Sequence, residues 1–512
     1  MKYVRVTSAI SLVFAIGIST NSLYAQNTYF DKYVDNAWKD FGHYVKTSRK
    51  EFEEYRNRVN QEFAEFMRGK WDRHEAEDPV PAPPLPEPPE PTVANPEDEP
   101  SNDKLPFAEI IPVPDVPAPP VALLPSFDGE EPELKVTPTL PSDPIAIRPP
   151  KHPGKEIAFN YYGSLCRIPF NKPVRVTLNG ADENSVADAW NRLTSEETVD
   201  LVRHCVDLRD RLCLPDWGYL RLVENLSNTL CPGDRNAATL LQMFLLTQSG
   251  YKVRIGRRDD RLLLLIPSSE NIYNFSYIPN GNLRYYIIDR DGKQGPIHLL
   301  DREFPREQFF SLALSRQPKL PINEEPSRHF TIERPAKIDV EVTVNSNLIN
   351  FYNDYPLSSH WNIYSNASLS EEVREQLFPE LRMSIEGKSE REAANILLHF
   401  VQKAFKYMTD GDQFGYERPF FPDETFHYPY SDCEDRAILY SVLVRELLGL
   451  DTVLVAYPNH LATAVRFDGE VAGDYFVIDG KNYTVCDPTY INADVGMAMR
   501  QYKNASAEII RL

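Results

Sequence analysis

Proline constrains the fold of this chain more than any other residue type, and most of it lies in one stretch. Twenty-four of the 43 prolines fall between Pro79 and Pro153. Proline fixes φ and has no amide hydrogen, so runs such as PAPPLPEPPEP cannot form a helix or a central strand. We predict that residues 77–154 form an extended, semi-rigid spacer that gives the flanking parts reach. The alternative is a ligand for an aromatic-lined groove on another protein.

The segment before the spacer begins with the pattern of an export signal. Lys2 and Arg5 supply a positive start, an apolar stretch follows, and Ala25 precedes the expected cleavage site. We predict that residues 1–25 are removed and that the mature chain is exported to the periplasm or beyond the cell. An uncleaved anchor is the alternative, although the apolar stretch is short for a membrane span.

Residues 26–76 are predicted to form an amphipathic helical segment. Apolar side chains recur there at three- and four-residue steps, with charged residues between them. The members of this stripe are Phe52, Tyr55, Val59, Phe63 and Phe66. Such a stripe packs on a domain or self-associates, and the alternative is a helix that binds a partner in the cell envelope.

Beyond the spacer the pattern is globular. With 512 residues and 42% hydrophobic side chains, the chain has enough length and apolar content for more than one core. We place a first unit at 155–325 and a second unit at 326–512. Lysine and arginine number 55 against 75 acidic residues, and the net charge of −20 argues against nucleic acid as a partner. Six cysteines are few for a disulfide scaffold, and we assign no bridge.

The second unit contains a cysteine placed for nucleophilic chemistry. In SDCEDRAILYSVLVRELLG, Cys433 precedes a run of helix formers that ends at Gly449. Ser431 and Glu434 have the spacing of a capping box, which puts Cys433 in the first turn of a helix. Backbone N–H groups and the helix dipole favour a thiolate there. The neighbouring acidic residues oppose it, so a nearby imidazolium is also required.

A histidine and an aspartate follow within a pattern of strands. His460 begins the strand-like segment HLATAVRF, and YFVIDGKNYTVCDPTY alternates like a hairpin with Asp479-Gly480 near its turn. Asp487 closes the second strand of that hairpin. A strand that begins at His460 can pair with one that ends at Asp487. The carboxylate can then orient the imidazole, and the imidazole can activate Cys433.

The segments SDCEDRAILYSVLVRELLG, NHLATAVRF and YTVCDPTY closely resemble the transglutaminase-like superfamily. The resemblance covers roughly residues 360–500 and includes REAANILLHFVQKAFKYMTD upstream. It implies that Cys433, His460 and Asp487 are the catalytic triad. The sequence departs from the family's pattern after the histidine, where Leu461 and Ala462 stand in place of the frequent aromatic residue.

The resemblance also implies a fold and an activity. The fold is α+β, transglutaminase-like and similar to papain-like cysteine proteases, with helices packed on an antiparallel sheet. The activity is acyl transfer at an amide, in which water gives hydrolysis and an amine gives a cross-link. We predict peptidase or amidase action on a protein or peptide substrate, without a cofactor or metal. The backbone N–H of Cys433 is the natural oxyanion donor, and the Gln413 side chain is a second candidate.

The first unit resembles a degenerate copy of the second, and together they predict two tandem copies of one fold. CPGDRNAATLLQMFLLTQSGYKVRIGR aligns with CEDRAILYSVLVRELLGLDTVLVAY, which puts Cys231 in the place of Cys433. Arg261 stands where the base His460 would be, so Cys231 is predicted to be a poor nucleophile. The alternative is that unrelated helix–strand units share this pattern.

The sequence leaves open which aspartate of the first unit corresponds to Asp487. The two candidates are Asp289 and Asp301. We predict that this unit is inactive and has a structural or ligand-binding role.

Two other classes of function compete with the enzyme. A non-catalytic envelope adaptor is the main alternative, because a helix, a spacer and an inactive unit also suit a protein that reaches a partner. A metalloenzyme is disfavoured because the sequence has no HExxH motif and no CxxC pair. No acidic calcium-loop pattern stands out either.

Overall fold

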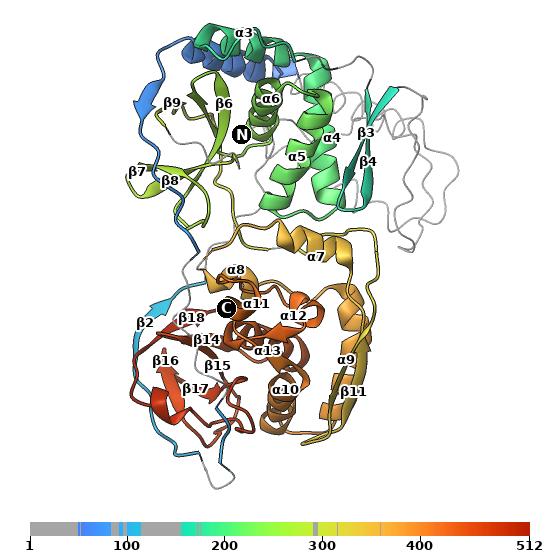
Figure 1. Cartoon of the computed structure of the whole chain (residues 1–512), viewed down its shortest axis with the longest axis vertical. Helices are drawn as coiled ribbons and strands as arrows, with labels where there is room; N and C mark the ends of the chain where they lie inside the picture. The colour runs from blue at the N-terminus through green and yellow to red at the C-terminus, as the bar shows by residue number, and fades with distance from the viewer. Residues whose placement is uncertain are drawn as a thin grey trace, which may run out of the picture. The chain divides into compact units, whose positions relative to one another are not determined.

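The computed structural model describes the chain between residues 50 and 512, with gaps (Figure 1). Residues 1–49, 52, 83–91, 96–99, 114–154, 171–173, 175, 290–294, 315 and 359 lie outside the description. The predicted export signal therefore lies outside the described residues. Among the described residues, no helix combines the length and the apolar character that crossing a membrane requires.

The described residues of the first unit form a hairpin, then helices, then a sheet. The hairpin pairs β3 (Lys155–Tyr161) with β4 (Ser164–Phe170). The helices are α3 (Glu183–Leu193), α4 (Glu196–Arg211), α5 (Asp216–Leu230) and α6 (Arg235–Gln248). The strands are β5 (Arg254–Arg258), β6 (Arg261–Ser268), β7 (Tyr277–Asn280), β8 (Leu283–Ile287) and β9 (Ile297–Leu300).

The second unit repeats this sequence of elements. Its hairpin pairs β10 (Arg328–Ile332) with β11 (Ile338–Val342). The helices are α7 (Ser346–Asn353), α8 (Trp361–Ser365), α9 (Glu371–Ile385), α10 (Glu390–Ala404), α11 (Asp410–Gln413), α12 (Glu424–His427), α13 (Cys433–Leu448) and the 3-10 turn η1 (Arg500–Tyr502). The short strands β12 (Lys406–Tyr407) and β13 (Tyr430–Ser431) pair in parallel. The main strands are β14 (Thr452–Tyr457), β15 (His460–Val465), β16 (Tyr475–Ile478), β17 (Lys481–Cys486) and β18 (Ala507–Arg511).

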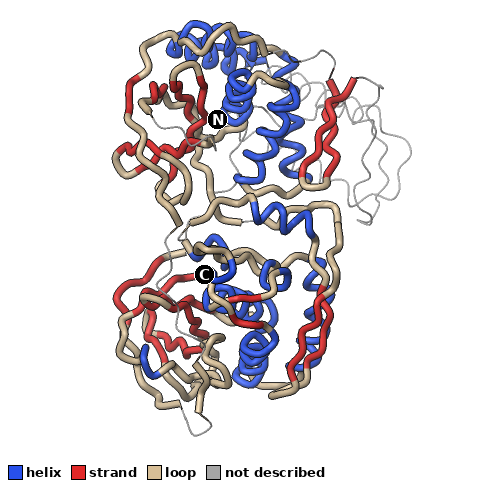
Figure 2. The backbone as a smooth tube through the Cα atoms, in the orientation of Figure 1, coloured by secondary structure: helices blue, strands red, loops and turns tan. Residues whose placement is uncertain are grey.

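The two main sheets have the same strand order. One runs β1-β9-β5-β6-β8-β7 and the other β2-β18-β14-β15-β17-β16, where β1 is Asp72–His74 and β2 is Phe107–Ile111. In the first unit α4 and α5 pack on the hairpin and α6 on the main sheet; in the second unit α9 and α10 pack on the hairpin and α13 on the main sheet (Figure 2). The helix that precedes the sheet packs on a central strand, α6 on β6 and α13 on β15. The α+β class predicted from the sequence is therefore confirmed.

Local sequence explains where the elements of the second unit begin and end. Ser389 and Glu392 form a reciprocal capping box at the start of α10. Helix α13 ends at Gly449, whose φ of +68° is the left-handed conformation that glycine adopts at helix C-termini. Asp479 and Gly480 both have positive φ, as a tight hairpin turn between β16 and β17 requires. The predicted hairpin with its Asp-Gly turn is confirmed.

The N-terminal helix ends earlier than the sequence predicts. Its last described residue is 67, whereas the pattern predicts helical structure over residues 26–76. After a buried Trp71, residues Asp72–His74 form β1 and pair antiparallel with β9. The ring of Phe63 packs on Trp190, with ring centroids 4.9 Å apart. The apolar stripe therefore packs on a globular unit over its described C-terminal part.

The proline-rich segment also differs from a free spacer. Phe107–Ile111 form β2, which lies between Pro106 and Pro112 and pairs in parallel with β18 at the edge of the second sheet. Leu105 is buried in the core of the second unit. The prolines bracket the strand rather than interrupt it, and an edge strand is the place where a sheet tolerates nearby proline. A spacer was the wrong prediction for this part of 77–154.

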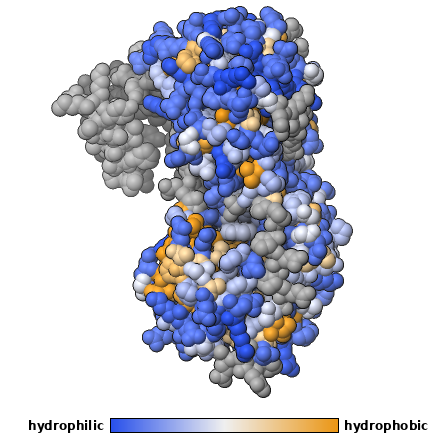
Figure 3. Space-filling view, turned by 60° about the vertical axis from the view of Figure 1, so that its left-hand side comes forward, coloured by the Kyte–Doolittle hydropathy of each residue, from blue (hydrophilic) through white to orange (hydrophobic). Residues whose placement is uncertain are grey.

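The surface agrees with the high content of charged residues. The face in Figure 3 is mostly hydrophilic, with hydrophobic side chains gathered in small areas. Large apolar residues that are exposed include Val113, Leu165, Ile322 and Met383. Single exposed apolar residues are normal on soluble surfaces, so none of them marks an interface by itself.

Candidate active site

Cys433 is the first residue of helix α13, as the sequence predicted, but the cap differs. The N-cap is Asp432 rather than Ser431, and the N3 residue is Asp435 rather than Glu434. The carboxylate oxygen Oδ2 of Asp435 accepts a hydrogen bond from the backbone N–H of Asp432 at 3.2 Å. Its Oδ1 accepts another from the N–H of Phe420 at 3.0 Å. Asp435 therefore ties the helix start to the preceding loop.

His460 and Asp487 are brought together as predicted. His460 is the first residue of β15, and Asp487 directly follows β17, which pairs with β15 through Thr463 and Cys486. The ring nitrogen Nε2 of His460 lies 2.8 Å from Oδ2 of Asp487. Both side chains are buried. This bond makes Nε2 the protonated nitrogen, so Nδ1 is left as a proton acceptor.

The Asp487 carboxylate is held from its other side by the backbone. Its Oδ1 accepts hydrogen bonds from the N–H groups of Thr489 and Tyr490, at 2.9 and 3.2 Å. The amide of Gln402 on α10 donates to the carbonyl oxygens of Asp487 and Ala493. The sequence analysis missed Gln402, because nothing in the pattern of a buried helix reveals which backbone groups a side chain will reach.

Aromatic rings fix the plane of the imidazole. The ring of Tyr502 is stacked on His460, with centroids 5.0 Å apart and planes 11° apart. Tyr457 stacks in turn on Tyr502, at 4.5 Å. The Tyr502 hydroxyl donates to Oδ1 of Asn459 at 3.0 Å, which anchors that ring to the residue before His460. Nδ1 of His460 is buried and has no hydrogen-bond partner among the described residues.

The Cys433 thiol meets the strand that carries His460. The backbone N–H of Leu461, the neighbour of His460, lies near the sulfur and acts to lower the pKa of Cys433. The thiol also donates to Oε2 of Glu434, at 3.1 Å. Burial raises the pKa of Cys433 above its usual range, and the carboxylates of Glu434 and Asp432 raise it further. In this arrangement the sulfur is a protonated thiol, so it needs a compensating positive charge to react.

A second missed residue is Arg436, which supports the first turn of α13 from inside the core. Its side chain is buried, and its guanidinium donates to the carbonyl oxygens of Phe405 and Gln402, at 2.8 and 3.5 Å. It also donates to the Ser431 hydroxyl at 3.3 Å. Arg436 thus joins the end of α10 to the start of α13, which carries Cys433.

Gln413, the second oxyanion candidate, lies at the C-terminal end of the short helix α11. Its oxygen Oε1 is buried without a hydrogen-bond partner among the described residues. No described contact links this side chain to Cys433, so its oxyanion role stays a prediction.

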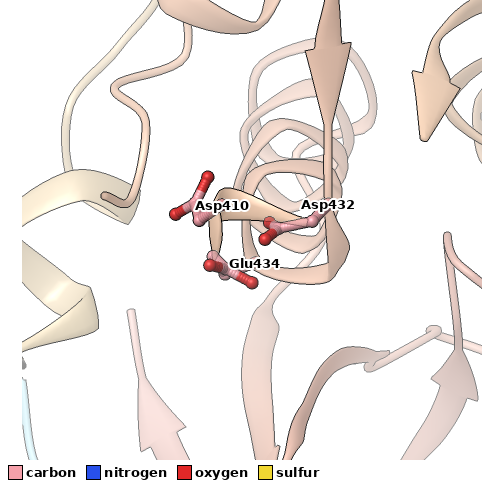
Figure 4. Close-up of side chains that lie close together, drawn as sticks. All are labelled: Asp410, Asp432 and Glu434. Atoms are coloured by element: carbon pink, nitrogen blue, oxygen red, sulfur yellow. The ribbon is translucent and has the colours of Figure 1, made fainter. Parts of the chain in front are cut away.

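Carboxyl groups gather beside the start of α13 in a way that the sequence analysis did not foresee. Figure 4 shows Asp410, Asp432 and Glu434 at this point. Burial raises the pKa of Asp410 to about 10, with the charges of Asp432 and Asp435 as further causes. The pKa of Glu417 is raised to about 8, again mainly by burial. Several buried carboxyl groups therefore lie beside the start of α13.

The first unit has an arginine where the second has its histidine. Arg261 begins β6, as His460 begins β15, and its Nε lies 3.9 Å from Oδ2 of Asp289. Of the two candidate aspartates, Asp289 is therefore the one that pairs with Arg261. The alternative, Asp301, accepts from Arg254 at 2.8 Å instead.

The predicted position of Cys231 is wrong. Cys231 is the C-cap of α5, and α6 begins only at Arg235 behind the N-cap Asp234. Cys231 therefore lies before the helix rather than in its first turn, where Cys433 lies. Burial and the nearby Asp234 raise its pKa to about 11. That Cys231 is a poor nucleophile stays a prediction.

Comparison with known proteins gives little further information. No family model matches the chain, and no curated protein matches it. A crystal structure described as a "putative protease" from Parabacteroides distasonis covers 49% of this chain, with 10% sequence identity and a TM-score of 0.17. The matched part spans 62% of the length of that protein. A similarity of this strength carries no argument about fold or function.

Proposed function

We propose that this chain is a cysteine-dependent acyl-transfer enzyme with a transglutaminase-like fold, which acts on amide or peptide bonds. The observation that carries the proposal is the pair formed by His460 and Asp487, joined at 2.8 Å through Nε2. Within the described part of the chain, the other ring nitrogen, Nδ1, is buried without a hydrogen-bond partner, and the next backbone N–H on its strand lies near the Cys433 sulfur. This arrangement supports the assignment of Cys433 as nucleophile, His460 as base and Asp487 as the orienting carboxylate.

The proposed reaction has two steps. Nδ1 of His460 takes the thiol proton, and the Cys433 sulfur attacks the substrate carbonyl carbon. The imidazolium then gives its proton to the leaving amine or ammonia, and a thioester remains on Cys433. Water, activated by the same nitrogen, releases the acid and regenerates the thiol. The backbone N–H of Cys433 at the start of α13 is available to stabilise the oxyanion.

We propose hydrolysis rather than cross-linking as the outcome. Water is the abundant acceptor, and no feature of the described residues provides a site for an amine. The substrate class is a protein or peptide, and the predicted signal at 1–25 places the enzyme outside the cytoplasm.

We also propose that the two units are tandem copies of one fold and that the first is inactive. The shared strand order and the shared order of hairpin, helices and sheet support this proposal. So does the equivalence of Arg261 with His460 and of Asp289 with Asp487. An arginine stays protonated near neutral pH and cannot act as a general base.

One observation favours a second candidate function, a non-catalytic adaptor. Cys433 is only 4% exposed, and its thiol donates to a carboxylate rather than to the imidazole. An inert buried thiol is arranged in this way. The adaptor would keep the fold of the second unit and use it for binding.

Product analysis separates these functions. The mature chain, residues 26–512, is incubated with a denatured, unstructured protein and a fluorescent primary amine, beside Cys433→Ala and Cys231→Ala. We expect new peptide termini or released ammonia with the wild type and with Cys231→Ala, and neither with Cys433→Ala. Incorporation of the amine in place of these products would overturn hydrolysis. Products that persist unchanged in Cys433→Ala would overturn the proposed nucleophile.

A further inference from the structure

Three carboxyl groups from separate positions converge at the N-terminal end of α13. Asp410 is the first residue of α11, Asp432 is the N-cap of α13, and Glu434 is the second residue of that helix. One oxygen from each lies within 4.8 Å of the others. None of the three residues is more than 1% exposed. Figure 4 shows the three groups gathered around one point.

Several oxygens in this cluster lack donors from the protein. Oδ2 of Asp410 accepts from the Arg418 N–H, and Oε2 of Glu434 accepts from the Cys433 thiol. The Asp435 N–H faces the Asp432 side chain across the helix cap, but among the described residues no well-aligned donor reaches either oxygen of Asp432, or Oε1 of Glu434. A fourth carboxyl group, that of Glu417, is 7% exposed and also has both oxygens without a donor. Its side chain contacts that of Glu434, so it points into the cluster. Buried polar atoms left without partners are costly, and a bound ligand is one way in which proteins satisfy them.

The nearby arginine side chains bind groups outside the carboxyl cluster. The Arg436 guanidinium donates to the backbone carbonyl oxygens of Phe405 and Gln402. The Arg418 guanidinium forms an ion pair with Glu424 at 2.6 Å. Its backbone N–H, rather than its charge, reaches Asp410, at 2.6 Å. Several buried carboxyl groups therefore face one another with no described side-chain cation placed among them.

We propose that Asp410, Asp432 and Glu434 bind a calcium-sized divalent cation, with Glu417 as a further ligand. Carboxylate oxygens are the ligands that such hard cations prefer. The three oxygens lie within 4.8 Å of one another, which is close enough for one Ca²⁺ ion, with ligands at about 2.3–2.6 Å, to reach all of them. Mg²⁺ loses its water ligands reluctantly and is seldom held by protein carboxylates alone, so the buried cluster favours calcium.

The position of this site links it to the proposed nucleophile. Cys433 lies between two of the ligands, Asp432 and Glu434, so the cation would fix the first turn of α13 and offset the negative charge beside the sulfur. Sequence analysis predicted no metal because the ligands come from separated segments, and no linear calcium-loop pattern joins them. The site does not depend on the proposed chemistry, because binding of the ion is measured without a substrate.

The test is calorimetric titration of the chelator-treated mature chain with CaCl₂ and, separately, with MgCl₂, together with thermal unfolding in each salt. We expect saturable binding of calcium, at least about tenfold tighter than that of magnesium, and a rise in Tm with calcium. Asp410→Asn and Glu434→Gln should weaken calcium binding at least about tenfold and remove the rise in Tm. Asp412→Asn is the matched control, because this exposed residue of α11 lies outside the cluster.

The Asp432→Asn variant distinguishes loss of calcium binding from a failure to fold. Because it removes one of several facing buried carboxylates, it should leave the Tm of the calcium-free chain unchanged or higher while weakening calcium binding. No saturable calcium binding by the wild type would overturn the proposal, and so would calcium binding that all three variants leave unchanged. Either result would leave the proposed triad untouched, since Cys433 and His460 are tested by their own reactions.

Discussion

Replacing Gln402 with alanine should destabilise the second unit strongly, because this one side chain holds three backbone groups around Asp487. Its Nε2 donates to the carbonyl oxygens of Asp487 at 3.2 Å and Ala493 at 3.0 Å. Its Oε1 accepts from the N–H of Asn492 at 3.1 Å. The side chain is 2% exposed, so water cannot easily take over these bonds.

The expected magnitude follows from the number of bonds. A hydrogen bond of this kind contributes about 0.5–1.5 kcal/mol, and a buried partner left unsatisfied costs about 1–3 kcal/mol. Three such bonds, at about 1–1.5 kcal/mol each, predict a loss of about 3–4.5 kcal/mol in the free energy of unfolding. Because the loop that carries Asp487 loses its support, the orientation of His460 should suffer as well.

Urea unfolding of the mature chain, followed by tyrosine and tryptophan fluorescence, measures this loss. Amide hydrogen exchange of Asn492 shows whether the loop opens locally. Gln501→Ala is the matched control, since Gln501 is exposed and should change stability by less than about 0.5 kcal/mol. A change of that small size in Gln402→Ala itself would refute the reasoning.

Two further predictions concern packing around the site. Tyr502→Ala removes the ring stacked on His460 and should slow alkylation of Cys433. Tyr502→Phe keeps the ring and should have little effect on that rate. Equal alkylation rates in the two variants would contradict a role for stacking. Gly473→Ala should lose at least about 2 kcal/mol of stability, because its Cβ would lie 2.3 Å from Cα of Gly496 and its φ is +146°. Gly469→Ala, which meets nothing within 4 Å, is the control in thermal unfolding, and a Gly473→Ala Tm equal to that of the control would refute the predicted clash.

The parts of the site that sequence could predict are those specified by local pattern. Helix formers after Cys433 and the terminal Gly449 predict α13, and they put the cysteine at its start. Alternation and the Asp479-Gly480 turn predict a hairpin. The register then follows, because a strand that begins at His460 pairs with the strand that ends just before Asp487.

The rest depends on contacts between distant segments. Asp410 begins the short helix α11 and Glu417 lies in the loop after it, and no periodicity reveals their approach to α13, so the carboxyl cluster could not be foreseen. Phe107–Ile111 is bracketed by prolines, and its pairing with β18 is set by a free sheet edge rather than by its own pattern. Cys231 was misplaced because a shared Asp-Arg pair suggested equal helix starts, while α6 begins after that aspartate.

The most direct test of the central claim is the rate at which iodoacetamide alkylates Cys433 near neutral pH. Mass spectrometry of the intact mature chain compares the wild type with Cys433→Ala, His460→Ala and Asp487→Asn. His329→Ala is the control, since His329 is an exposed histidine that pairs with Asp339. The account predicts one fast-reacting site that disappears in Cys433→Ala and slows at least about tenfold in His460→Ala and Asp487→Asn, but not in the control. If Cys433 reacts like an ordinary thiol and His460→Ala does not change its rate, the proposed enzyme function is contradicted. The non-catalytic adaptor then becomes the favoured function.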